Sequence, residues 1–181
     1  MALQLLKALE EHPHVIANGY TVFLDEKCLA GVAIGEPWQE GLYQGLRGSD
    51  LIVLLVSNAG LQSCATAHER ADNYLLEVEH ALAMREAGLA KVFPIFLKTD
   101  AAARFDYTLT QYSEQEAYHP WAQRPVRDTL KELFSLQGVK FELVRTNQLQ
   151  GALVTTVESV LDNLGKFIGH LSLVFLSELG A

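Results

Sequence analysis

The sequence contains few of the residues that mark metal centres, disulfide frameworks and nucleic-acid surfaces. Among 181 residues there are two cysteines, Cys28 and Cys64, whose spacing fits neither a disulfide framework nor a metal site. The six histidines form no HExxH motif and no paired Cys/His cluster, so no metal ligand is predicted. Lys and Arg number 14 against 22 Asp and Glu, for a net charge of -8, which argues against a nucleic-acid-binding surface.

Targeting and membrane-spanning patterns are also missing. The first residues lack a basic segment followed by an apolar run and a cleavage site, so no secretory signal is expected. The longest apolar run near residue 175 is interrupted by serines and is too short to span a bilayer. We therefore expect a cytoplasmic protein. Its apolar content of 49% is enough for a substantial core, and its length suits one domain over residues 1–181.

Apolar strands alternate with amphipathic helices along the chain. The pattern predicts strands at 20–24, 51–56, 91–97, 139–144 and 171–176. It predicts helices at 2–11, 37–47, 72–87, 125–136 and 148–168, with polar or irregular connections at 57–70 and 99–124. Pro94 favours a place toward an edge of the sheet. This alternation predicts an α/β fold with a parallel sheet, helices on both faces and a ligand site beyond the carboxyl ends of the strands.

The predicted helix over 72–87 carries the most informative polar residue. Asp72 is placed to cap its N-terminus and Gly88 to end it. Its apolar face is formed by Leu75, Leu76, Val78, Ala81, Leu82 and Met84. Glu77 lies among these residues, although a helical glutamate taken alone is more often a solvated surface charge than a catalytic acid. Glu79, two residues further on, points to a different face of the helix.

An ordered series of segments resembles the Toll/interleukin-1 receptor (TIR) domain. The matching features are a strand ending in Phe23-Leu24-Asp25, then Cys28-Leu29, then Gly35 three residues before Trp38, then a hydrophobic strand ending in Ser57. The segments DNYLLEVEHAL and KVFPIFL resemble the next TIR helix and strand. The similarity covers residues 1–100 well and is weaker over 125–165. It implies a flavodoxin-like, doubly wound parallel sheet.

The resemblance implies one of two functions, because TIR domains include assembly modules and enzymes that cleave NAD+ at the nicotinamide–ribose bond. The enzymes carry a glutamate in the third helix, followed by an apolar residue and then a small-plus-apolar pair. Glu77, with Val78 and Ala81-Leu82 after it, matches this pattern. The resemblance therefore implies that Glu77 is catalytic, with NAD+ as the substrate, no cofactor, and a signalling or defence role. One carboxylate suits the reaction, because nicotinamide leaves as a neutral molecule while positive charge grows on the ribose.

The substrate-binding positions implied by the resemblance include one departure from the family pattern. Enzymatic relatives often carry a tryptophan four residues before the glutamate, where this chain has Asn73. Trp38 or Tyr74 would replace that ring, or else pack in the core. Cys28 and Ser177 complete the expected substrate-binding set. The resemblance also implies self-association, or contact with other TIR domains, through the loop at 26–37.

The order of the strands departs from the TIR pattern as well. A TIR domain opens with a strand that reads like DVFLSY, whereas this sequence starts at the helix that follows it. We expect residues 171–176 to fill the missing central position, as in a circular permutation, which places Ser177 at the ligand edge. The alternative is a truncated chain in which 171–176 form a tail helix or strand.

Two further functions compete with catalysis. In a non-catalytic TIR interaction module, Glu77 would be a surface charge. A receiver-like phosphoacceptor shares the same doubly wound topology, but it needs an acidic pair and a lysine at strand ends. Asp25 lacks partners of that kind, so this function is disfavoured.

Overall fold

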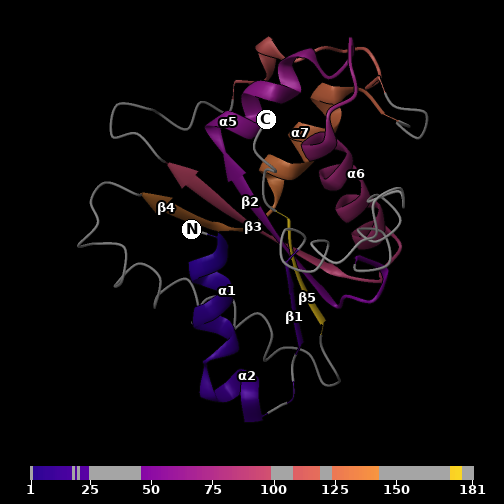
Figure 1. Ribbon diagram of the computed structural model, residues 1–181. Coiled ribbons are helices and arrows are strands. Elements are labelled where there is room, and N and C mark those ends of the chain that lie inside the picture. Colours follow the sequence, from indigo (N-terminus) through magenta and orange to yellow (C-terminus); the bar gives the residue numbers. More distant parts are fainter. Residues whose placement is uncertain are drawn as a thin grey trace, which may run out of the picture.

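A computed structural model describes residues 2–17, 19, 21–24, 46–98, 108–118, 124–142 and 172–176 (Figure 1). Within these ranges the chain forms a five-stranded sheet of order β1-β5-β2-β3-β4. The strands are β1 (Thr21–Leu24), β2 (Leu51–Ser57), β3 (Lys91–Lys98), β4 (Val139–Glu142) and β5 (Ser172–Leu176). Every pair of neighbouring strands is parallel, which confirms the predicted α/β fold with a doubly wound sheet.

The strand β5, drawn in yellow in Figure 1, lies inside the sheet between β1 and β2. Its ladder with β1 runs from Thr21↔Ser172 to Leu24↔Phe175, and its ladder with β2 ends at Leu54↔Leu176. Residues 171–176 were predicted to fill this position, and the pairing confirms it. Since the strand has neighbours on both sides, the alternative in which this segment is only a tail is excluded.

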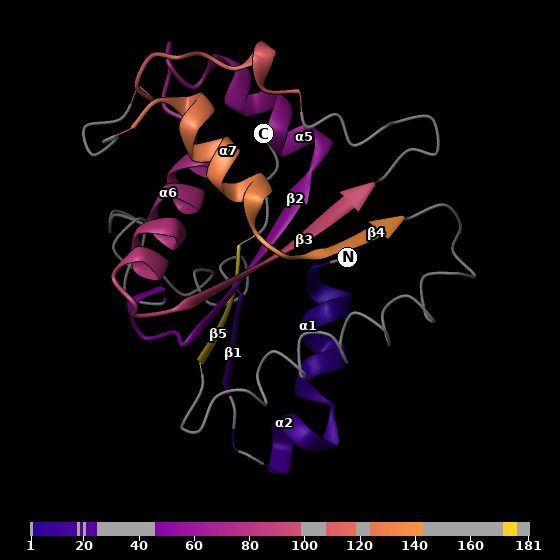
Figure 2. The same ribbon diagram turned by 180° about the vertical axis from the view of Figure 1, so that it is seen from behind.

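Helices lie on both sides of the sheet (Figures 1 and 2). On one side are α1 (Ala2–Glu10) and α2 (Pro13–Ala17), and on the other are α6 (Asn73–Glu86) and α7 (Val126–Ser135). The first helix ends before Pro13, as predicted. A second, short helix that the sequence pattern did not predict begins at this proline, because the first turn of a helix does not need the N–H group that proline lacks.

The strand β2 is buried on both of its faces. Ile52, Leu54 and Val56 belong to a core cluster that also contains most of the buried apolar residues of α6 and α7. The alternate residues, Leu51, Val53 and Leu55, point to the other face of the sheet and are at most 4% exposed. A continuous apolar run is typical of a strand covered on both faces, and the sequence predicted it for this segment.

The connection at 57–70, predicted as a polar connection, contains two short helices. They are α5 (Asn58–Ser63) and η2 (Cys64–Thr66). The Ser57 hydroxyl accepts a hydrogen bond from the Gly60 N–H at 3.2 Å and so caps α5. A similar short turn, η3 (Leu109–Gln111), lies in the connection predicted as irregular at 99–124. The helix predicted at 148–168, and most of the one at 37–47, lie outside the described residues.

Pro94 lies toward one edge of the sheet, as predicted, but not in the edge strand, because β3 has β2 on one side and the edge strand β4 on the other. The ladder between β3 and β4 begins one residue after the proline, at Ile95↔Val139. Pro94 therefore stands just before this ladder, where the absence of an N–H group removes none of its hydrogen bonds. Proline is tolerated here because the neighbouring strand β4 begins to pair only after Pro94.

Candidate functional site

The helix α6 begins at the carboxyl edge of the sheet. In its first turn, the Tyr74 hydroxyl donates a hydrogen bond to the Leu55 carbonyl near the end of β2, at 3.4 Å. The helix ends at Glu86, and β3 starts at Lys91, so α6 runs antiparallel to the strands it connects. The N-terminal turns of α6 therefore lie at the edge where doubly wound sheets bind their ligands.

Both ends of α6 are fixed by local signals that the sequence predicted. The Asp72 carboxylate accepts a hydrogen bond from the Leu75 N–H at 2.8 Å, which confirms it as the N-cap. At the other end, Gly88 has a φ of 69°. The Leu89 N–H donates to the Met84 carbonyl at 2.9 Å, which forms a glycine-terminated helix end. Asp72 and Gly88 thus set the residues at which α6 begins and ends.

Glu77 lies in the second turn of α6 and is 2% exposed. Its neighbours in the helix, Leu75, Leu76 and Val78, are buried as well, so the carboxyl group is on the covered part of the helix. The interpretation of Glu77 as a solvated surface charge is therefore wrong. Burial of a carboxylate is costly unless the surroundings or a bound ligand compensate for it, which makes this residue the strongest candidate in the described structure.

The other predicted site residues divide into two groups. Asn73 and Tyr74 lie with Glu77 in the first turns of α6, Asn73 exposed and Tyr74 with 5% of its surface accessible. Trp38, Cys28 and Ser177 lie outside the described residues, as does the loop at 26–37. The described structure thus brings three of the six candidates together, and it places the ring of Tyr74 in the core.

Glu79 faces α7. Its Oε1 atom lies 3.3 Å from the hydroxyl of the buried Thr129. Burial raises the pKa of Glu79, whereas the hydrogen bond with Thr129 and the charge of Arg124 act in the opposite direction. This half-buried acid contributes to the packing of the two helices. No local pattern predicts that role, because the partner stands 50 residues away in the chain.

Ion pairs join the C-terminal half of α6 to α7. The Arg124 guanidinium contacts Glu132 of α7 and lies 2.9 Å from Glu86 of α6. Glu132 also pairs with Arg85 at 3.1 Å. Networks of this kind hold partly exposed helices in a fixed arrangement, although each single pair contributes little. The end of α6 far from Glu77 is therefore held against α7.

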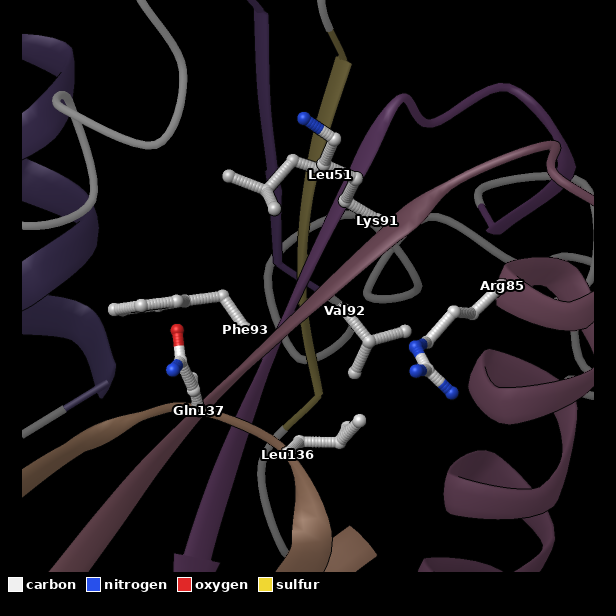
Figure 3. Close-up of a pocket in the computed structure, with 7 residues that line it drawn as sticks. All are labelled: Leu51, Arg85, Lys91, Val92, Phe93, Leu136 and Gln137. Carbon is white, nitrogen blue, oxygen red and sulfur yellow. The ribbon is translucent and has the colours of Figure 1, made fainter. Parts of the chain in front are cut away.

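A cavity of about 250 Å³ lies at the opposite edge of the sheet (Figure 3). Leu51 and Lys91, which begin β2 and β3, contribute to its lining. The remaining lining residues are Arg85, Val92, Phe93, Leu136 and Gln137. Figure 3 shows Phe93 and Gln137 on one side of the β3 ribbon and Val92, Leu136 and Arg85 on the other. Because it opens at the amino ends of the strands, this cavity is separate from the candidate site.

In the part of the chain that the structure describes, no group of three His, Cys, Asp or Glu side chains is arranged to hold a metal ion. Over the same ranges, each helix is too short or too polar to cross a membrane. The candidate site therefore consists, in its described part, of side chains at the start of α6.

A family model described as TIR domain matches residues 1–123, which is more than half of the chain. Comparisons with curated proteins and with solved structures gave no match. The parallel sheet, with a central strand flanked by β1 and β2, agrees with the flavodoxin-like fold of this family. The chain therefore belongs to the TIR domain family.

Proposed function

We propose that this protein is a TIR-type NAD+ glycohydrolase in which Glu77 is the catalytic carboxylate. TIR domains are signalling and defence modules that interact with other TIR domains, and the family includes members that cleave NAD+. The substrate would bind at the carboxyl edge of the sheet, beside the first turns of α6. The products would be nicotinamide and ADP-ribose.

The burial of Glu77 is the observation that carries this proposal. The 2% exposure of Glu77 has a cost in free energy that its surroundings or a bound ligand must compensate. A catalytic carboxylate gains from the same surroundings, because a site with little water strengthens its interaction with a positive transition state. The first turn of α6 lies near the carboxyl end of β2, and this edge of a doubly wound sheet suits a dinucleotide ligand.

The reaction requires one negative charge near the ribose. The C–N bond between ribose and nicotinamide breaks, and its electron pair stays with the nicotinamide nitrogen, which leaves neutral. The ribose becomes oxocarbenium-like, and water then adds to its anomeric carbon and releases a proton. Glu77 would accept hydrogen bonds from the ribose hydroxyls and stabilise the positive charge. Removal of such an electrostatic group commonly costs about 10²–10³-fold in kcat.

Nicotinamide release by the purified full chain tests the proposal. Glu77→Gln keeps the size of the side chain and removes its charge, and we expect kcat to fall by about 100-fold or more. Glu79→Gln is the matched control, since it makes the same change two residues away on the side that faces α7. The control should keep turnover within about twofold of the wild type, as expected for a group outside the reaction.

The two competing outcomes are distinct. Turnover that persists in Glu77→Gln at the wild-type rate would remove this residue from the mechanism. A folded wild-type protein that releases no nicotinamide at any concentration would point to a non-catalytic interaction module. Assays over a wide range of protein concentration also test self-association, because an assembly-dependent enzyme gains specific activity as its concentration rises.

A further inference from the structure

We infer that Tyr74 is the positioning residue for Glu77: its hydroxyl ties the first turn of α6 to the end of β2, one helical turn before the carboxylate. This inference rests on the proposed function for its catalytic consequence. It replaces the expectation that the tyrosine ring contacts the substrate.

The side chain of Tyr74 is built into the core. The residue is 5% exposed and belongs to the apolar cluster that includes Ile52 and Leu54 of β2. Its hydroxyl donates a hydrogen bond to the Leu55 carbonyl at 3.4 Å. A buried tyrosine normally directs its hydroxyl to a polar partner, and here the partner is a backbone carbonyl of the neighbouring strand. The buried ring and its hydroxyl therefore attach the first turn of α6 to β2.

Leu55 lies where the described pairing between β2 and β5 ends. The ladder between β5 and β2 ends at the pair Leu54↔Leu176, so Leu55 is the first residue of β2 beyond the last described pair with the central strand. The carboxyl ends of β5 and β2 meet here, and helices lie on both faces of the sheet. This is the switch point at which doubly wound folds bind their ligands. Tyr74 thus anchors α6 at the position where a ligand is expected.

The spacing between Tyr74 and Glu77 relates the position of the tyrosine to that of the carboxylate. Tyr74 and Glu77 stand three residues apart, so they lie one above the other on the same part of the helix surface. Both are at most 5% exposed. A shift of the first turn relative to β2 would move the Glu77 carboxylate relative to the sheet edge by a similar amount. A displacement of about 1 Å is enough to lower catalysis by up to ~100-fold.

Tyr74→Phe tests the inference, because it keeps the ring and removes the hydroxyl. We expect kcat for nicotinamide release to fall about tenfold while KM stays within about twofold, since the substrate still binds but the carboxylate is misplaced. The matched control is Tyr112→Phe. Tyr112 is 1% exposed, and its hydroxyl accepts a hydrogen bond from Gln111 at 2.9 Å, beside α7. This control removes a buried tyrosine hydroxyl that contacts Gln111 of η3 rather than the end of β2, and it should leave kcat unchanged.

A second measurement does not depend on turnover. Amide hydrogen exchange over residues 75–78 should become faster in Tyr74→Phe and stay as in the wild type in Tyr112→Phe, because only the first variant loosens the start of α6. Equal effects of the two variants on exchange and on kcat would overturn the inference. If the wild-type protein releases no nicotinamide, the proposed function fails, and the exchange measurement alone then decides whether Tyr74 fixes the helix.

Discussion

Gly138 packs directly against the backbone of Pro94. A Cβ atom added at Gly138 would come within 2.1 Å of the Pro94 carbonyl oxygen and 2.7 Å of its ring. Both contacts are far shorter than van der Waals distances, and one involves backbone that has little freedom to move. The absence of a side chain at Gly138 therefore allows β4 to start beside β3 immediately after the proline.

Gly138→Ala should destabilise the fold by about 1–3 kcal/mol, the usual cost of adding atoms to a closely packed site. Urea denaturation followed by circular dichroism measures the change. Gly88→Ala is an informative comparison, because its Cβ would meet nothing within 4 Å and the cost would come from its φ of 69°. That conformation costs about 1 kcal/mol for alanine. A Gly138→Ala protein as stable as the wild type would contradict the contact with Pro94.

Asp72→Ala should lower the free energy of unfolding by about 1 kcal/mol, because it removes the N-cap of α6 and leaves the Leu75 N–H without its side-chain acceptor. Thermal and urea unfolding would measure the change. Glu69→Ala is the control: this exposed acid stands in the preceding connection, and its removal should alter stability by less than about 0.5 kcal/mol. Equal effects of both changes would mean that the cap does not stabilise the helix.

Glu79 should make stability depend on pH. Burial raises the pKa of this carboxyl above its ordinary value of 4.5. The folded protein therefore holds the proton more tightly than the unfolded chain, and the stability linked to that proton is complete below pH 4.5 and is lost as the pH rises through the folded-state pKa. Glu79→Gln, which does not titrate, should thus become more stable relative to the wild type as the pH rises from 4 to 7.

Urea denaturation across this pH range measures the effect of Glu79→Gln. The exposed Glu69→Gln variant corrects for the loss of one negative charge from a chain whose net charge is -8. A difference in stability between Glu79→Gln and the wild type that stays constant from pH 4 to pH 7 would show that the protonation of this acid is not linked to folding.

Deletion of residues 172–176 should abolish cooperative unfolding, because it removes the strand between β1 and β2 and leaves both without a neighbour on that side. Circular dichroism and a denaturation curve would show the loss. The control is deletion of residues 178–181, which follow the strand and should leave the transition in place. A folded and stable protein without 172–176 would be incompatible with a central position for β5.

The sequence by itself determined the elements that depend on local chemistry. Asp72 and Gly88 fix the ends of α6, because a cap needs only a side-chain acceptor or a positive φ within a few residues. The apolar run of β2 likewise predicted a strand buried on both faces. The order of such segments was sufficient to predict the family and the parallel sheet, since both follow from the succession of strands and helices.

The tertiary structure alone decided which groups are removed from water and what they contact. It buried Glu77, placed the Tyr74 hydroxyl on Leu55 and set Glu79 against Thr129, because burial depends on elements that are distant in sequence. It also gave Pro94 a neighbouring strand, because Gly138, just before β4, packs against Pro94 and so sets where β4 begins. Helix periodicity gives the face on which a side chain stands, and only the packed sheet and helices determine what covers that face.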